Sequence, residues 1–362
     1  MDTYHVIGLM SGSSLDGLDI AYCRFGQLNG RWEFEIVYTD VAEYPNIWIP
    51  KFKSLPTNDA KALWETHAAL GHYFGERVSD FINKYSLQGK VDLVASHGHT
   101  IFHFPGNRFT TQIGDGAAIA ARAGVPVVCD FRTSDIANGG QGTPIVPIGD
   151  KLLFNDYKFC LNIGGIANIS CKTKTGIVAF DICAANQVLN HFAQTQGKEY
   201  DAGGEIAQKG ILNIEMLDRL NTLQFYKHSY PKSLDNSFSR DMVLPIMEEF
   251  SISVEDKMHT YVQHIAIQIA AHVNGIAARE NISITARDKM LVTGGGAFNT
   301  FLIERMSTLG IDVEVPNEEL VKFKEAVVIA LMGVLRMRNE VNVLSSVTGA
   351  SKDTVGGAVY LP

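Results

Sequence analysis

Short apolar runs alternate along the chain with longer stretches in which apolar residues recur at every third or fourth position. Runs rich in Val, Ile and aromatic residues predict strands at residues 4–10, 18–25, 32–38, 91–96, 125–129, 159–163, 166–170, 177–180, 289–292, 311–315 and 358–360. The helical period predicts helices at residues 58–84, 115–123, 184–195, 205–222, 240–250, 255–280, 299–309 and 323–338. This alternation of strands and helices indicates an α/β fold.

The two halves of the pattern begin alike. Each opens with two strands joined by a turn that contains Gly, at residues 4–25 and at residues 159–170, which suggests an ancient duplication. A chain of 362 residues is too long for one ordinary core. We place the boundary at the turn-rich loop after residue 137 and expect the chain to return to its first lobe at its end. The expected lobes are therefore residues 1–137 with 341–362, and residues 138–340.

Composition narrows the class of protein. Hydrophobic residues make up 46% and charged residues 19% of the chain, as in globular proteins. The formal charge is −8 and no basic stripe is present, which argues against a nucleic-acid partner. The five Cys residues are scattered and form no C-x-x-C pair, so neither a disulfide framework nor a zinc site is expected. No leader segment or membrane-spanning run is recognisable, and we expect a cytoplasmic protein without a membrane partner.

Three clusters of Gly lie at the ends of predicted strands, at residues 12–17, 164–165 and 294–296. Backbone N–H groups reach phosphate oxygens most easily where side chains are absent, so such clusters can form an anion cradle. A single cluster is explained equally well as turn geometry, but three favour phosphate binding. The P-loop and dinucleotide fingerprints are both absent, so a nucleotide would need a different fold.

Several acidic residues are candidates for chemistry. Asp181 follows the apolar run at residues 177–180 and could act as a general base in a cleft, or could simply cap the next helix. Asp16 and Asp19 flank Gly17 and would suit the binding of hydrated Mg²⁺. The residues alone leave both readings of Asp181 open.

Three histidines lie close together. In an extended segment His97, His99 and His103 share one side, a pattern that allows a zinc site. Gly98 and Thr100 favour a hydrogen-bonding loop instead, and no Cys or carboxylate partner is obvious.

Three further charged residues stand out. Arg132, after a buried strand, could bind a carboxylate or anchor a loop. Glu325 begins an apolar helix, where an acid favours the helix dipole without any function. Lys232, after Pro231, has no assigned role.

Seven motifs follow one another along the chain: GLMSGSSLDGLD (8–19), SHGHT (96–100), DFR (130–132), GGQGTPIVP (139–147), NIGGIAN (162–168), GGGAFN (294–299) and TGA (348–350). Together they closely resemble the anhydro-N-acetylmuramic acid kinase family, from about residue 5 to the end of the chain. That family belongs to the superfamily of actin, heat-shock chaperones and sugar kinases. The resemblance implies an actin-like ATPase fold, with two RNase-H-like lobes and a nucleotide cleft between them.

The resemblance also implies an activity. The family's enzymes are ATP-dependent phosphotransferases that act on an alcohol group, with ATP and Mg²⁺. They open the 1,6-anhydro ring of 1,6-anhydro-N-acetylmuramic acid with water and phosphorylate O6, which gives N-acetylmuramic acid 6-phosphate in cell-wall recycling. A small anhydro-amino-sugar substrate and a homodimer are implied. Two alternatives stay open: a related kinase with a different amino-sugar substrate, and a catalytically impaired nucleotide-binding homologue.

Residue by residue, the resemblance implies that Asp181 is the catalytic base. The nucleotide would bind at Gly12, Ser13, Ser14, Leu15, Asp16, Gly17, Leu18 and Asp19, at Gly164, Gly165 and Asn168, and at Gly294, Gly295, Gly296 and Asn299. Asp16 and Asp19 would bind the metal directly or through water. The sugar would contact His97, Thr100, Arg132 and Glu325, with Arg132 pairing with the lactyl carboxylate.

One segment departs from the family's pattern. The family follows its catalytic Asp with Thr-Gly-Pro-Gly-Asn, whereas this chain has Ile-Cys-Ala-Ala at residues 182–185 before Asn186. Side chains therefore project where the family has bare backbone, and a turn preset by Gly and Pro is lost. Smaller departures are Ser13 or Ser14 for Thr, His99 for Gln, and Thr143 for Ala.

Overall fold

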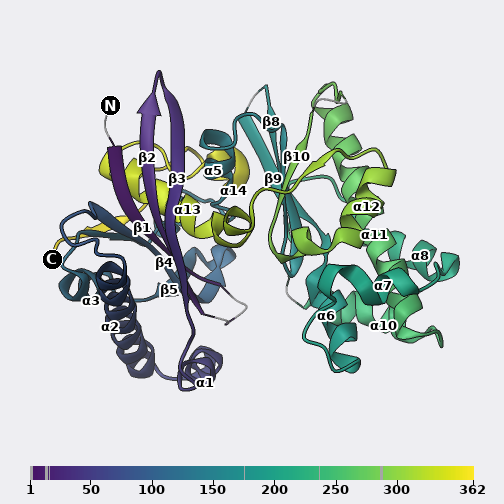
Figure 1. The fold of residues 1–362 in the computed structure, drawn as a ribbon, viewed down its shortest axis with the longest axis horizontal. Helices are drawn as coiled ribbons and strands as arrows, with labels where there is room; N and C mark the ends of the chain where they lie inside the picture. The colour runs from purple at the N-terminus through teal and green to yellow at the C-terminus, as the bar shows by residue number, and fades with distance from the viewer. Residues whose placement is uncertain (1–2, 13–14, 16, 175, 236, 286–287) are drawn as a thin grey trace. The chain divides into compact units, whose positions relative to one another are not determined.

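The chain divides into two compact units in the computed structural model, which describes residues 3–12, 15, 17–174, 176–235, 237–285 and 288–362. Unit 1 comprises Met1–Phe154 with Phe323–Pro362, and unit 2 comprises Asn155–Lys322. Each unit has its own sheet and its own helices (Figure 1).

The sheet of unit 1 begins with a meander of three antiparallel strands, β1 (Thr3–Ser11), β2 (Leu18–Leu28) and β3 (Arg31–Ala42). Two strands parallel to β1 continue it, β4 (Leu93–Phe104) and β6 (Val127–Cys129), and β12 (Ala358–Tyr360) completes the edge. The order is β12-β6-β4-β1-β2-β3, and β5 (Phe109–Ile113) forms a hairpin with β4.

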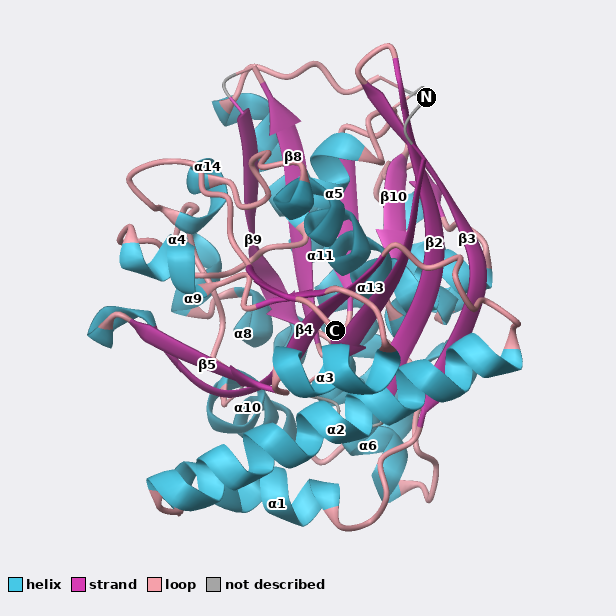
Figure 2. Cartoon of the chain, turned by 90° about the vertical axis from the view of Figure 1, so that its left-hand side faces the viewer, coloured by secondary structure: helices cyan, strands magenta, loops and turns pink. Residues whose placement is uncertain are grey.

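Helices cover both faces of this sheet, and alternate residues of β1 point to opposite faces. Ile7 and Leu9 are fully buried in a cluster with residues of α2 (Ala60–Lys84) and α3 (Gly116–Ala123). Figure 2 shows these two helices side by side across the sheet. Gly8, between them in sequence, faces α13 (Glu318–Met337) so closely that a Cβ there would lie 2.0 Å from the carbonyl oxygen of Ala326.

The sheet of unit 2 repeats this order. A meander of β7 (Phe159–Ile163), β8 (Ile166–Thr173) and β9 (Gly176–Ala184) is extended by β10 (Met290–Thr293), parallel to β7, and then by β11 (Val313–Glu314). Its order is β11-β10-β7-β8-β9. Each unit thus joins a three-stranded meander to parallel strands. This arrangement confirms the predicted α/β fold class with two RNase-H-like lobes.

The core of unit 2 is built around α11 (Val254–Arg279), whose Tyr261 is fully buried and donates a hydrogen bond to the carbonyl oxygen of Ala184 (2.8 Å). The Ser253 side chain caps this helix at Asp256 N–H. The other helices of the unit are α6 (Asn186–Thr195), α7 (Glu205–Lys209), α8 (Ile214–Asn221), α9 (Gln224–Lys227), α10 (Leu244–Glu248) and α12 (Thr300–Thr308). Unit 1 also contains α1 (Trp48–Ser54), α4 (Thr133–Ala137), α5 (Pro147–Leu152) and α14 (Ser345–Thr348).

Two predicted elements differ from the structure. Residues 97–100, predicted as a loop after the strand 91–96, are part of strand β4, because this part of the strand pairs with β1 and β5, with His99 opposite both Ser11 and Ile113. The helix predicted at 205–222 is two helices, α7 and α8. Gly210 lies between them, and a Cβ there would be 2.1 Å from the carbonyl oxygen of Glu255, so the chain turns at this close backbone contact.

The unit boundaries also differ from the expected lobes of 1–137 with 341–362 and of 138–340. The turn-rich segment belongs to unit 1, because buried Asp135 accepts hydrogen bonds from Gly142 N–H (2.8 Å) and from the Thr348 hydroxyl (2.7 Å). Asp150 on α5 forms a buried ion pair with Lys324 on α13 (2.7 Å). These contacts hold both the 138–154 segment and most of α13 in unit 1.

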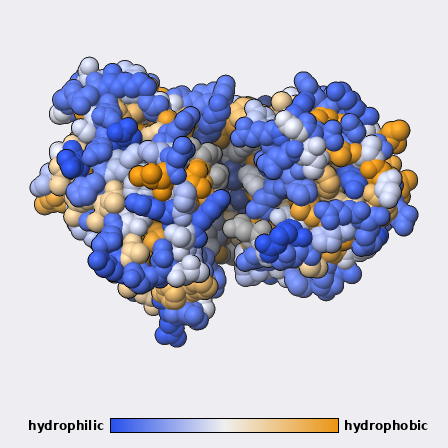
Figure 3. Space-filling view, turned by 90° about the horizontal axis from the view of Figure 1, so that it is seen from below, coloured by the Kyte–Doolittle hydropathy of each residue, from blue (hydrophilic) through white to orange (hydrophobic). Residues whose placement is uncertain are grey.

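No helix in the described part of the chain is long and apolar enough to cross a bilayer. The face shown in Figure 3 is mostly hydrophilic, with hydrophobic residues in small separate groups.

The contact between β1 and α13 gives a test of the fold. We expect Gly8→Ala to destabilise unit 1 by about 1–3 kcal/mol, because the new methyl group overlaps a backbone carbonyl that cannot rotate away. Urea unfolding followed by tryptophan fluorescence measures this, since Trp32, Trp48 and Trp64 all lie in unit 1. Gly106→Ala is the matched control, with no atom within 4 Å of the added Cβ. Equal urea midpoints for the two variants would contradict the proposed packing.

Candidate functional site

Three of the four candidate sugar-side residues lie on or just after parallel strands of unit 1, and the fourth, Glu325, lies on α13. Strands β1, β4 and β6 run in one direction, so their carboxyl ends lie at one edge of the sheet. Ser11 ends β1, His97 and Thr100 lie in the middle of β4, and Arg132 follows β6. The structure therefore gathers residues that are far apart in the sequence.

His97 and Arg132 are hydrogen-bonded to each other. The Arg132 guanidinium donates from Nε (3.0 Å) and Nη2 (2.8 Å) to Nε2 of His97, and His97 Nδ1 lies 2.9 Å from the Gly98 carbonyl oxygen. The bonds fix one tautomer, with the proton on Nδ1 and the lone pair of Nε2 facing Arg132. Burial and the Arg132 charge lower the pKa of His97 to about 3, so the ring is neutral.

Glu325 supplies the opposing charge. Burial lowers the pKa of Arg132 to about 10, and the Glu325 carboxylate acts against that shift. Burial raises the pKa of Glu325, while the charges of Arg132 and Lys324 lower it. Thr100 accepts a hydrogen bond from Gln112 Nε2 (3.2 Å). All four predicted sugar contacts thus belong to unit 1, where a half-buried guanidinium is the natural partner for a carboxylate.

A second hydrogen-bond chain lies at the end of β1, and the sequence did not reveal it. Tyr44 donates to Ser11 Oγ (2.6 Å), and Ser11 Oγ lies 2.9 Å from His99 Nδ1. The Phe52 ring stacks on the His99 ring, with centroids 4.1 Å apart. Burial lowers the pKa of His99 to about 4. These hydrogen bonds hold the Ser11 side chain at the start of the predicted phosphate loop.

The first phosphate loop is described only in part, since Ser13, Ser14 and Asp16 lie outside the described residues. Leu15 has a left-handed backbone (φ +61°), and its N–H points to the Gly12 carbonyl oxygen (3.4 Å). Leu18 is buried at the start of β2, next to half-buried Asp19, which pairs with Met10 and Val41. Gly17 packs against Ala42, where a Cβ would lie 2.9 Å from the carbonyl oxygen.

In unit 2, a polar row crosses the sheet. The row starts at Thr293 on β10, which lies opposite Asn162 on β7. Asn168 on β8 lies opposite both Asn162 on β7 and Asp181 on β9. Directly opposed residues share one face of a sheet, so the Asp181 carboxylate and two amide side chains point the same way. Asn162 and Thr293 were not among the predicted site residues, although the register of two adjacent meander strands could have placed Asn162.

Asp181 lies inside β9, because the strand continues to Ala184. The reading of Asp181 as a helix cap is therefore wrong, since Ala185 stands at the N-cap of α6. Its Oδ2 accepts a hydrogen bond from Leu234 N–H (2.8 Å). Burial raises the pKa of Asp181, while that hydrogen bond and the charge of Lys232 lower it. A half-buried carboxylate with a raised pKa has the properties of a general base.

The altered segment after Asp181 is tightly held. Ile182, Cys183, Ala184 and Ala185 are all buried. The N–H groups of Ala185 (2.8 Å) and Gln187 (3.2 Å) donate to the Gly165 carbonyl oxygen, and Asn186 N–H donates to that of Gly164 (3.1 Å). The second Gly turn and the segment that lost its Gly and Pro residues are thus joined by backbone hydrogen bonds.

The third Gly cluster lies at the carboxyl end of β10. Gly294 has φ +80°, and Gly296 packs on Ile163, where a Cβ would lie 2.2 Å from the side chain. Gly295 is more open, with Asn186 Nδ2 3.8 Å from its Cβ position. Asn299 caps α12 by accepting from Leu302 N–H (3.0 Å) and is buried, so its amide has a structural role.

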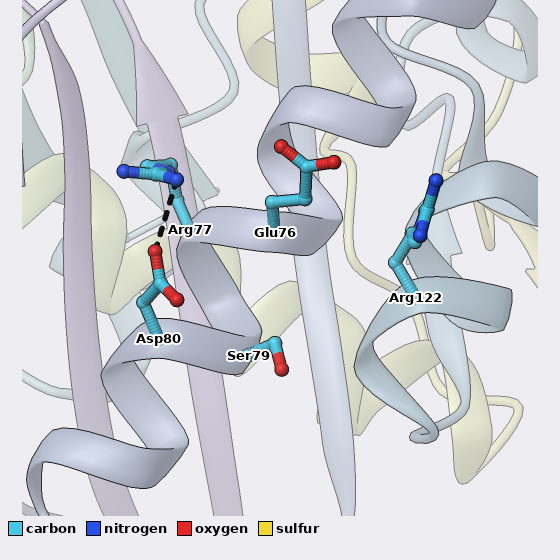
Figure 4. A pocket seen from close by; sticks show the side chains of 5 residues that line it. All are labelled: Glu76, Arg77, Ser79, Asp80 and Arg122. Atoms are coloured by element: carbon cyan, nitrogen blue, oxygen red, sulfur yellow. Dashed lines mark ion pairs between the residues drawn. The ribbon is translucent and has the colours of Figure 1, made fainter.

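Other possible sites are less developed. Among the described residues, no group of three or more His, Cys, Asp or Glu side chains is placed to hold a metal ion. The three histidines at 97–103 therefore do not form such a group. A surface pocket lies between α2 and α3, lined by Glu76, Arg77, Ser79, Asp80 and Arg122. Figure 4 shows these side chains and the Arg77–Asp80 ion pair (2.9 Å). None of the predicted site residues lines it.

Comparison with known proteins gives a consistent result. A family model described as anhydro-N-acetylmuramic acid kinase matches residues 4–362. The enzyme of that name from Francisella tularensis subsp. novicida is 32% identical over 378 residues, which covers 98% of each chain. That from Caldanaerobacter subterraneus subsp. tengcongensis is 31% identical over 383 residues, covering 98% of this chain and 96% of the relative. That from Bacillus cereus is 30% identical over 387 residues, covering 99% of each.

The histidine environments give a spectroscopic test. We expect His97 and His99 to stay neutral from about pH 5.5 to 8, because burial lowers both pKa values far below the ordinary 6.5. The unfolded chain binds these protons near pH 6.5, so the free energy of unfolding should fall as the pH drops below that value. Nitrogen-15 NMR of the ring nitrogens measures charge and tautomer, and His97→Gln should flatten the pH dependence. Titration of either folded ring between pH 6 and 7 would contradict the assignment.

Proposed function

Because the chain belongs to the anhydro-N-acetylmuramic acid kinase family, we propose that it transfers the γ-phosphoryl group of ATP to O6 of 1,6-anhydro-N-acetylmuramic acid. Water opens the anhydro ring in the same reaction, so the products are N-acetylmuramic acid 6-phosphate and ADP. The observation that carries the proposal is the Asp181 carboxylate, half-buried in a polar row and oriented by Leu234 N–H. The family match over residues 4–362 supports it.

In this proposal Asp181 is the general base. It removes a proton from water, the water oxygen bonds to C1, and the C1–O6 bond breaks. The freed O6 then bonds to the γ-phosphorus of ATP as ADP leaves. Such chemistry depends on positioning and charge rather than on a covalent enzyme intermediate.

The sugar side of the proposal rests on unit 1. Arg132 pairs with the lactyl carboxylate, and neutral His97 keeps the guanidinium in place through Nε2. Thr100 and Glu325 contact the hydroxyl and amide groups of the sugar. A rigid bidentate guanidinium suits a carboxylate better than a Lys ammonium group would.

In this proposal the nucleotide-binding residues are Gly12–Asp19 on unit 1, and on unit 2 the turn at Gly164 and Gly165 with Asn168 and the cluster Gly294–Gly296. Asn299 acts there by fixing the start of α12. The oxygen donor of Asp19 fits Mg²⁺, which commonly binds one or two carboxylates together with substrate phosphates. When bound, Mg²⁺ would neutralise charge on the phosphates. The cytoplasmic location and the homodimer remain predictions.

One observation favours a second candidate, a related kinase acting on a different amino sugar. His99 stands where the family has Gln, and it is held by both Ser11 and Phe52. A panel of amino sugars with and without the anhydro bridge, compared by kcat/KM, decides between the two.

Replacement of the base gives the first functional test. We expect Asp181→Asn to lower kcat by about 10²–10⁴-fold, because the amide cannot accept the water proton. Formation of the 6-phosphate measured by phosphorus-31 NMR reports the rate. Asp218→Asn, at an exposed position on α8, is the control and should retain activity. Undiminished turnover by Asp181→Asn, or no product from the unmodified protein with ATP and Mg²⁺, would refute the proposal.

The proposed contact of Arg132 with the sugar gives a second functional test. We expect Arg132→Met to raise the KM for the sugar by about 10–100-fold, the loss expected for a hydrogen-bonded charge pair, and to leave the KM for ATP nearly unchanged. Arg122→Met, on the exposed surface of α3, is the matched control. Circular dichroism checks that the variant folds. An equal rise in both KM values would argue against a specific contact with the carboxylate.

A further inference from the structure

The segment from Tyr230 to Leu234 runs beside β9, the edge strand of the unit 2 sheet. Asp181 N–H donates to the Lys232 carbonyl oxygen (3.2 Å), and Leu234 N–H donates to Asp181 Oδ2 (2.8 Å). The segment therefore contacts both the backbone and the side chain of Asp181. Any group that holds the segment in place also holds the carboxylate.

The Lys232 side chain is such a group. Its Nζ donates to the Phe225 carbonyl oxygen (3.2 Å) and lies 2.8 Å from Nε2 of His272 on α11. It also lies 4.3 Å from the centre of the Phe225 ring and 5.9 Å from that of Phe180. Two hydrogen-bond acceptors and two aromatic faces thus surround the ammonium group, an arrangement suited to a cation.

His272 accepts rather than donates in this contact. Its Nδ1 lies 2.7 Å from the Gln268 carbonyl oxygen, which can only accept, so Nδ1 carries the proton and Nε2 receives one from Lys232. Burial lowers the pKa of His272, which agrees with a neutral ring. Burial also lowers the pKa of Lys232 to about 8, while Cys183 and Asp181 oppose that shift.

We propose that Lys232 is a positioning residue for the phosphoryl transfer. Its ammonium group fixes the 230–234 segment against β9, so that Leu234 N–H orients the Asp181 carboxylate, and its positive charge keeps that carboxylate ionised. This inference rests on the proposed function, in which Asp181 must be ionised to accept a proton from water.

Three other titratable groups around this point carry little charge near neutral pH, and the charged pair nearby, Glu280 and Arg279, contacts Tyr230. Burial raises the pKa of Cys183 on β9 and of Tyr226 on α9, and His272 on α11 is neutral. Tyr230 donates to Glu280 (2.6 Å), and the Arg279 guanidinium lies 4.2 Å from the centre of the Tyr230 ring. Among the described residues, Lys232 is the cation whose charge acts on Asp181.

The test compares Lys232→Met, which removes the charge but keeps the length, with Lys232→Arg, which keeps the charge. Lys227→Met, on exposed α9, is the matched control for loss of a positive charge. The acidic limb of the kcat/KM profile should move to higher pH by about one unit in Lys232→Met, because an opposite charge favours the ionised carboxylate. Lys232→Arg should return the limb toward its original position, and Lys227→Met should leave it unchanged.

A readout without turnover separates this inference from the proposed function. Carbon-13 NMR of labelled Asp side chains, assigned through Asp181→Asn, gives the titration of the carboxyl group directly. We expect the pKa of Asp181 to rise in Lys232→Met, and in the unmodified protein its signal should respond again near pH 8, where Lys232 loses its proton. An unchanged Asp181 titration in Lys232→Met would overturn the inference even if the kinase reaction is observed. If that variant does not fold, absence of the response near pH 8 in the unmodified protein overturns it.

Discussion

Within each unit, most of the candidate residues lie on or just after strands that run in one direction, whereas Asp19 and Asn168 lie on the antiparallel strands β2 and β8. Parallel strands place their carboxyl ends at one edge of a sheet, so loops distant in sequence must begin side by side. In unit 1 this constraint gathers the ends of β1, β4 and β6, and in unit 2 those of β7, β9 and β10. Gly8 on β1 and Gly296 just after β10 pack closely on neighbouring elements, where a Cβ would overlap atoms of Ala326 or Ile163.

Burial then determines the charge of each group at these edges. It keeps His97 and His99 neutral, and it raises the pKa of Asp181. The compensating charges are few and local: Glu325 acts on Arg132, and Lys232 acts on Asp181. A half-buried site with few compensating charges responds strongly to a ligand that brings a charge of its own, as phosphates and a lactyl carboxylate do.

Most strands and long helices were predictable, because their apolar periodicity reflects packing against a single sheet. The hairpin of β4 and β5 was not, since Gly98 and the surrounding polar residues interrupt the alternation and the strand is stabilised by pairing with distant residues. Asp181 could be singled out from its place after the apolar run at residues 177–180 and from the family resemblance. No local signal in the sequence indicates two contacts that depend on the tertiary fold. Leu234, 53 residues from Asp181, binds its carboxylate, and Arg132, 35 residues from His97, binds its ring.

The discontinuity of unit 1 has a consequence for synthesis of the chain. β1 is made first, but α13, which covers the face of β1 at Gly8, and the edge strand β12 are made only after the whole of unit 2. At about 5–20 residues per second, the first strands wait roughly 15–60 s for their partners. During that interval the uncovered apolar face of the first sheet is available to chaperones, whereas unit 2 is continuous and can fold as soon as it emerges.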